Sequence, residues 1–95
     1  MLEKQIENKI KNYLKTVSGL FYWKEHGGMY GTAGIPDLII CYRGRFIALE
    51  VKNERGKLTP LQSATLEKIK RCGGIAKAVK SVEDVKEIIE NEIKD

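Results

Sequence analysis

The spacing of apolar residues along the chain predicts its first elements. Residues 2–17 place apolar side chains three or four positions apart, which predicts a helix that ends at Ser18-Gly19. Aromatic residues at 20–23 predict a strand, and the glycines between residues 25 and 36 predict a loop. The apolar face of the first helix consists of Leu2, Ile6, Ile10, Tyr13, Leu14 and Val17.

A β-hairpin is predicted next, with strands at about residues 37–42 and 45–52. Arg43-Gly44 forms its two-residue turn, where a glycine at the second position suits the positive φ of such turns. With this turn Tyr42 faces Arg45, and counting outward places Asp37 opposite Glu50. Directly paired residues share a face of the sheet and lie ~5 Å apart at Cβ. The hairpin therefore brings two carboxylates together.

The second half of the chain predicts a helix, a strand and a final helix. Thr59-Pro60-Leu61-Gln62 has a good N-cap, a proline at the first helical position and a glutamine that completes a capping box. The apolar stripe of this helix continues to Gly73-Gly74, and a short strand follows at residues 75–79. The stripe consists of Leu66, Ile69 and Cys72, and the last helix turns Val82, Val85, Ile88, Ile89 and Ile93 inward.

These elements predict a single α/β domain over residues 1–95 with the order αβββαβα. The strand at 75–79 should lie parallel to the second hairpin strand, since such crossovers are right-handed. Both hairpin faces carry apolar residues, so a mixed central sheet covered by helices on both faces is expected. One face holds Leu38, Ile40, Leu49 and Val51, and the other holds Ile39, Cys41, Phe46 and Ala48.

Composition and charge narrow the class of protein. The 95 residues are 42% hydrophobic and 32% charged, as expected of one small globular domain. No apolar run approaches a membrane span, and the charged N-terminus lacks a secretion signal. The two cysteines are expected to be reduced thiols packed against the core, which favours an intracellular location. Residues 1–82 contain 15 Lys/Arg and 7 Asp/Glu, so this part of the chain is positively charged and suits a polyanionic partner.

The carboxylate pair suggests a site for a divalent cation. Asp37 and Glu50 repel each other unless a cation bridges them, and the backbone carbonyl of Val51 is available as a further oxygen ligand. Oxygen ligands of this kind suit Mg²⁺ or Mn²⁺. Lys52 shares a face with Glu50, where it can orient an attacking water and stabilise charge at phosphorus. The alternative is an ordinary ion-pair cluster on an edge strand.

These residues resemble a known nuclease pattern. Gly34-Ile35-Pro36-Asp37, a hairpin and Glu50-Val51-Lys52 are similar to the PD-(D/E)xK motif of the restriction-endonuclease-like core. The glycine before Pro36-Asp37, and Thr59-Pro60-Leu61-Gln62 after the lysine, resemble the VRR-NUC branch, in particular its stand-alone phage and bacterial members. The similarity runs from about residue 3 to residue 80.

The resemblance implies roles for individual residues. Asp37 and Glu50 would bind the metal and Lys52 would serve the attacking water. Glu7 would be the glutamate that the first helix contributes to the metal site, with Glu3 as the second choice. Gln62 would match the catalytic glutamine of the group, although the capping box also explains it.

Further residues are candidates for contact with nucleic acid. Lys24 lies where relatives carry a basic residue near the scissile phosphate, although it could equally be an exposed lysine. Tyr30 in the glycine loop could stack on a base, and Arg55 and Lys57 follow the catalytic strand as phosphate contacts.

The function implied is a Mg²⁺- or Mn²⁺-dependent, structure-selective DNA endonuclease in the cytoplasm of a bacterium or of a phage-infected host. Stand-alone members resemble Holliday-junction resolvases, which implies branched DNA, a homodimer, and roles in recombination or repair. The first helix and the strand at residues 20–23 are candidate dimer surfaces. The alternative is a non-catalytic module similar to a double-stranded-RNA-binding domain, which also has a basic surface and an αβββα order. That alternative does not explain the carboxylate pair beside Lys52 or the last strand and helix.

Overall fold

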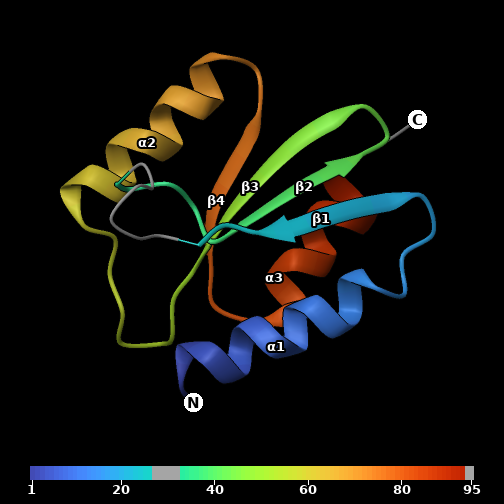
Figure 1. Cartoon of the computed structure of the whole chain (residues 1–95), viewed down its shortest axis with the longest axis horizontal. Helices are drawn as coiled ribbons and strands as arrows, with labels where there is room; N and C mark the ends of the chain where they lie inside the picture. Colours follow the sequence, from blue (N-terminus) through green and yellow to red (C-terminus); the bar gives the residue numbers. More distant parts are fainter. Residues whose placement is uncertain (27–32, 94–95) are drawn as a thin grey trace.

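A computed structural model describes residues 1–26 and 33–93 and confirms the predicted order of elements (Figure 1). The last helix continues into a short π-helical segment, Ile88–Glu92, which the periodicity did not predict. The elements are α1 (Glu3–Leu14), β1 (Leu20–Lys24), β2 (Leu38–Tyr42), β3 (Arg45–Val51), α2 (Pro60–Arg71), β4 (Ile75–Val79) and α3 (Val82–Glu87).

The four strands form one mixed sheet in the order β1-β2-β3-β4. β1, β2 and β3 pair antiparallel, and β4 lies parallel to β3 as predicted. Tyr42 pairs with Arg45, so the predicted hairpin register is confirmed. Both turn residues have positive φ, 53° at Arg43 and 75° at Gly44, which matches the twist of the strands they join. Asp37 comes directly before the first residue of β2.

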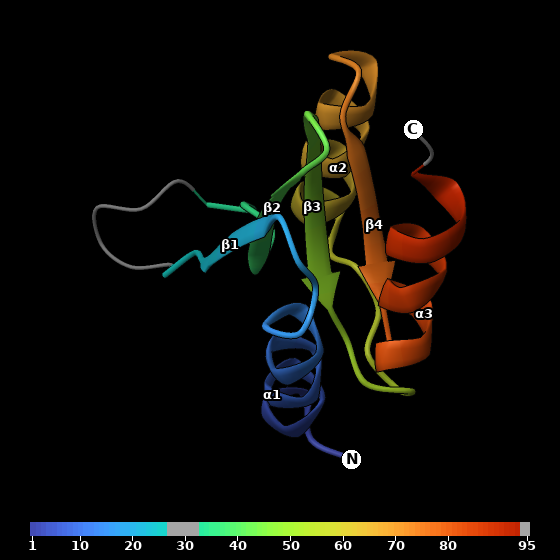
Figure 2. The same cartoon turned by 90° about the vertical axis from the view of Figure 1, so that its right-hand side faces the viewer.

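Helices cover the two faces of the sheet unequally. α1 and α3 lie beside each other against one face, where the larger core cluster includes Leu38, Ile40 and Leu49 (Figure 2). α2 packs on the other face through Leu66, over a small cluster with Ile39, Ala48 and Ala76. Among the described residues, no helix is long and apolar enough to cross a membrane.

Four predictions of buried apolar residues were wrong. Cys41 and Phe46 lie on the α2 face of the hairpin but are exposed, because α2 covers only the neighbouring positions of the sheet. Cys72 follows the last residue of α2 and is also exposed, so both thiols are free but neither packs in the core. Leu2 precedes α1 and is 67% exposed, outside the buried stripe of that helix.

The start of α2 fixes the chain segment that leads to Asp37. The predicted capping box is present: Gln62 N donates to Thr59 Oγ1 (3.1 Å), and Thr59 N donates to Gln62 Oε1 (3.0 Å). Gly34, with φ of +81°, packs against the first turn of α2, since a Cβ there would lie 2.7 Å from Leu61 Cγ. Only glycine suits both this backbone and this contact. The Gly34–Asp37 segment is therefore held on α2.

Candidate active site

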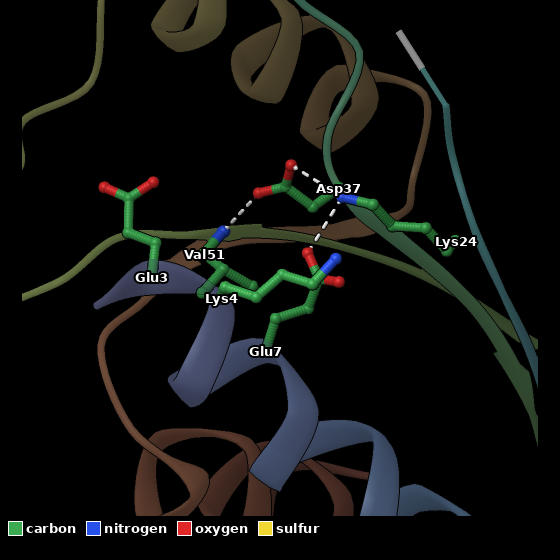
Figure 3. A pocket seen from close by; sticks show the side chains of 6 residues that line it. All are labelled: Glu3, Lys4, Glu7, Lys24, Asp37 and Val51. Carbon is green, nitrogen blue, oxygen red and sulfur yellow. Dashed lines mark hydrogen bonds and ion pairs between the residues drawn. The ribbon is translucent and has the colours of Figure 1, made fainter. Parts of the chain in front are cut away.

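Asp37 lies at the end of the sheet, where its carboxylate contacts residues of β1 and β3. Its Oδ2 accepts a 2.7 Å hydrogen bond from the backbone N–H of Val51, the last residue of β3 (Figure 3). Its Oδ1 lies 3.3 Å from Nζ of Lys24, the last residue of β1. Glu50 lies opposite Asp37 when the hairpin register is continued by one residue beyond the Leu38–Leu49 pair. These contacts fix the Asp37 carboxylate from both sides.

The Asp37–Glu50 pair is the strongest electrostatic feature of the site. Glu50 is only 4% exposed, and burial, followed by the hydrogen bond and charge of Asp37, raises the pKa of Glu50 to about 8. Burial also acts to raise the pKa of Asp37, but hydrogen bonds from Glu50 and Val51, together with Lys24, lower it overall. At neutral pH the pair therefore keeps one proton, mainly on Glu50, and carries one negative charge.

Lys24 links Asp37 to the first helix. Its Nζ donates to Glu7 Oε1 at 2.8 Å and to Asp37 Oδ1 at 3.3 Å. Glu7 is 7% exposed and also pairs with Lys11 at 3.3 Å, one helical turn further on. Burial acts to raise the pKa of Glu7, but the bonds and charges of the two lysines lower it overall. Glu7 is therefore an ionised carboxylate directed to the same place as Asp37.

A cavity of about 230 Å³ lies between α1 and the end of the sheet. Figure 3 shows Glu7 directed toward Lys24 and Asp37, whereas the Glu3 carboxylate lies apart from them. The structure thus favours Glu7 over Glu3 as the helix carboxylate near Asp37. The cavity is lined by Glu3, Lys4, Glu7, Lys24, Asp37 and Val51.

The other residues predicted for the site differ in their burial and in their contacts. Lys52 is half-buried and close enough to Glu50 that its charge opposes the rise in the Glu50 pKa. The side chain of Gln62 is held in the capping box, which leaves its catalytic role a prediction. Arg55 and Lys57 are exposed in the connection between β3 and α2. Tyr30 lies outside the described residues.

The donor set suits a hard divalent cation. Asp37 and Glu50 provide carboxylate oxygens from opposite positions of the hairpin, and the negative charge of Asp37 contributes to the raised pKa of Glu50. Lys24 provides the positive charge between Asp37 and Glu7. Over residues 1–26 and 33–93, no three His, Cys, Asp or Glu side chains converge as a group that could hold a metal ion. Binding of one cation by Asp37, Glu50 and Glu7 together would therefore require these side chains to move closer to one another, and Glu50 to lose its proton.

Sequence reasoning missed the two roles that lysines have in this site. The pair between Glu7 and Lys11 could have been predicted, because residues four apart on a helix are neighbours. The bridge from Lys24 to Glu7 could not, since it depends on where α1 lies against the end of β1. Lys24 was expected near the phosphate and is found bonded to two candidate metal ligands.

The pKa of Glu50 predicts how stability depends on pH. The Glu50 carboxyl group loses its proton near pH 4.5 in the unfolded chain but only near pH 8 in the folded protein. The contribution of Glu50 to stability therefore falls as the pH rises from about 4.5 to about 8. We expect Glu50→Gln to raise the free energy of unfolding by at least about 1 kcal/mol at about pH 9, and by less at about pH 5. Urea denaturation in the presence of a chelator measures both values. An equal difference at the two pH values would contradict the shared proton.

Comparisons with known proteins agree with the fold. One solved structure, a VRR_NUC domain, superimposes with a TM-score of 0.79 at 27% identity, covering 96% of this chain and 97% of its own. A second, a VRR_NUC domain protein, gives a TM-score of 0.77 at 22% identity, covering 95% of this chain and 86% of its own. No curated protein sequence matches the chain.

The family model of the VRR-NUC domain matches residues 2–83, which include every described candidate residue of the site. This match confirms the resemblance inferred from the Pro36-Asp37 and Glu50-Val51-Lys52 motifs. The match also argues against the alternative of a double-stranded-RNA-binding module, because the matched family is one of nucleases. The chain belongs to the VRR-NUC family of nucleases.

Proposed function

We propose that this protein is a divalent-metal-dependent endonuclease that hydrolyses phosphodiester bonds in branched DNA. The observation that supports it best is the placement of Asp37 opposite Glu50 in the hairpin register, with the Val51 N–H 2.7 Å from the Asp37 carboxylate and the charge of Lys52 acting on Glu50. Glu50 is a buried carboxyl group with a strongly raised pKa, and such groups occur preferentially at functional sites. The VRR-NUC match adds a nuclease family to that chemistry.

Asp37, Glu50, Glu7 and the carbonyl of Val51 are the proposed ligands of Mg²⁺ or Mn²⁺. When bound, the cation would polarise a phosphoryl oxygen and stabilise the charge of the transition state. Asp37 is prepared for this role, since its hydrogen bond from the Val51 N–H fixes the direction of the carboxylate. Glu50 must first release its proton, which the charge of Lys52 favours.

The other side chains act on the substrate and the water. Lys52 is proposed to orient the attacking water and to stabilise negative charge that develops at phosphorus. Gln62 is proposed to assist from the first turn of α2, where the capping box fixes its side chain. Lys24 is proposed to meet the scissile phosphate, because its ammonium group already lies beside Asp37.

A cleavage assay on a panel of DNA structures tests this proposal. Four-way junctions, flaps and linear duplexes of equal length are incubated with Mg²⁺, with Mn²⁺ or with a chelator. We expect cleavage of branched DNA to exceed cleavage of the duplex and to require the cation. Cleavage in the chelator would contradict the metal dependence, and equal rates on all substrates would contradict the structural selectivity.

Arg55 and Lys57 are proposed to bind DNA phosphates. Replacing both with alanine should weaken DNA binding and reduce the slope of log affinity against log salt by about 0.9 for each phosphate that is no longer neutralised. Binding isotherms between low and moderate salt measure this slope. The matched control is Lys70→Ala, which removes a charge that is paired with Glu67 on α2. A double variant with the wild-type slope would exclude both residues from the interface.

A homodimer is the second part of the proposal, since symmetric cleavage of a junction requires two active sites. The structure favours the β1 side of the sheet over α1 as the dimer surface. The apolar residues of α1 at positions 6, 10 and 14 are buried within the protomer, whereas Phe21 and Trp23 on β1 are exposed. Phe21 pairs with Cys41, and Cys41 pairs with Phe46, so an exposed apolar strip crosses three strands.

Two substitutions at equally exposed apolar residues distinguish these surfaces. Phe21 is 66% exposed on the strip and Leu2 is 67% exposed at the start of α1. We expect Phe21→Asp to yield monomers because a charge is costly in an apolar interface, whereas Leu2→Asp should leave the dimer intact. Sedimentation equilibrium measures the mass of each. A wild-type monomer at all concentrations, or dissociation by Leu2→Asp alone, would contradict the assignment.

A further inference from the structure

The ammonium group of Lys24 lies between two carboxylates from different elements. It is 2.8 Å from Oε1 of Glu7 on α1 and 3.3 Å from Oδ1 of Asp37 before β2 (Figure 3). The lysine side chain is 26% exposed and that of Glu7 is 9% exposed, so the contacts are partly shielded from water. Among the described residues, Lys24 is the residue that bridges Glu7 and Asp37.

The backbone determines this position. Lys24 is the last residue of β1 and pairs with Leu38, the residue that follows Asp37. The N–H of Glu25 then donates to the carbonyl of Asp37 at 2.8 Å, which continues the pairing past the end of the strand. Lys24 is therefore held beside Asp37 by the sheet itself, and its three donors can serve both carboxylates.

We propose that Lys24 is an internal counter-ion that occupies the place of the divalent cation in the metal-free protein and competes with it. This inference rests on the proposed function, because it takes Asp37 and Glu7 as ligands of the metal. The ammonium group keeps the two carboxylates together without a metal. It must move away when a divalent cation takes the same oxygens, since one oxygen set cannot neutralise both charges at close range. A DNA phosphate near the metal would then accept the released ammonium group.

Competition of this kind has a measurable consequence that does not depend on cleavage. Removing the charge of Lys24 should increase the affinity for Mn²⁺, whereas removing a residue that merely helps to build the site should decrease it. We expect Lys24→Met, which keeps the length of the side chain, to bind Mn²⁺ at least about fivefold more tightly than the wild type. Isothermal titration calorimetry without DNA measures this affinity.

Two further variants separate competition from a general effect of charge. Lys11→Met removes the other lysine bonded to Glu7, one helical turn further along α1, and should change the Mn²⁺ affinity less than about twofold. Lys24→Arg keeps the charge beside the carboxylates and should bind nearly as weakly as the wild type. Equal tightening by Lys11→Met and Lys24→Met would overturn the proposal, because net charge alone would then explain both.

Thermal unfolding provides a second measurement. Lys24→Met leaves Asp37 and Glu7 without their shared partner, so the metal-free variant should have a lower Tm than the wild type, and Mn²⁺ should raise its Tm by more. Lys24→Met with wild-type or weaker Mn²⁺ affinity would overturn this inference and leave the proposed function intact. An absence of Mn²⁺ binding in the folded wild type and in every variant would instead overturn the proposed metal site, and this inference with it.

Discussion

Replacing Asp37 with asparagine is expected to abolish Mn²⁺ binding and to lower the rate of DNA cleavage by more than about 100-fold, since even residues that only support metal ligands contribute up to about that factor. Among the described residues, Asp37 is the carboxylate that both accepts from the Val51 N–H and pairs with Lys24. Asparagine keeps an oxygen that can accept from the Val51 N–H but loses the negative charge. Calorimetry and a junction-cleavage assay measure the two effects.

The stability of the Asp37→Asn variant shows whether the substitution merely disrupts the fold. Without the charge of Asp37, the pKa of Glu50 should fall, because the hydrogen bond and charge of Asp37 are two of the causes that raise it. The folded protein should therefore remain as stable as the wild type at about pH 9, or become more stable. Wild-type cleavage by a well-folded Asp37→Asn variant would end the assignment of Asp37 as a metal ligand.

Replacing Lys52 with alanine should separate binding from chemistry. We expect the variant to keep Mn²⁺ and DNA binding and to cleave about 100- to 1,000-fold more slowly, the range typical of removing one group that stabilises developing charge. Single-turnover cleavage at saturating DNA and metal measures the chemical step alone. Because the loss of Lys52 should raise the pKa of Glu50 further, the two rates are compared over a range of pH values that extends well above 8, until both become independent of pH.

Lys77 provides the matched control for Lys52. It lies in β4, the strand next to β3, but its ammonium group pairs with Glu92 at 2.6 Å, away from the carboxyl pair. Lys77→Ala removes the same charge from the neighbouring strand and should cleave DNA at the wild-type rate. A Lys52→Ala variant that also cuts as fast as the wild type would show that the lysine of the motif has no catalytic role.

The sequence predicted those features that depend on local signals. The turn at Arg43-Gly44 sets the register of the hairpin, so the residue spacing predicted that Asp37 and Glu50 lie opposite each other. The capping box at Thr59 and Gln62 set the start of α2 within one residue. Alternation along β2 and β3 assigned residues to the correct faces. In each case the signal lies within a few residues of the feature.

Features that depend on how distant elements meet were not predicted. Alternation says which face Phe46 and Cys41 share, but only the length and angle of α2 decide whether that face is covered. The Lys24 bridge depends on α1 and β1 meeting at one end of the sheet. The raised pKa of Glu50 depends mainly on burial, which the neighbouring layers create. None of these has a signature in residue spacing.

The tight Arg43-Gly44 turn lies at the end of the hairpin away from Asp37 and Glu50. A peptide inserted at this tip would leave the paired strands and their side-chain alternation unchanged, whereas a single residue inserted within either strand would exchange inward and outward side chains along it. The hairpin tip is thus the natural place to attach a fluorescent probe or an affinity tag while the catalytic end keeps its geometry.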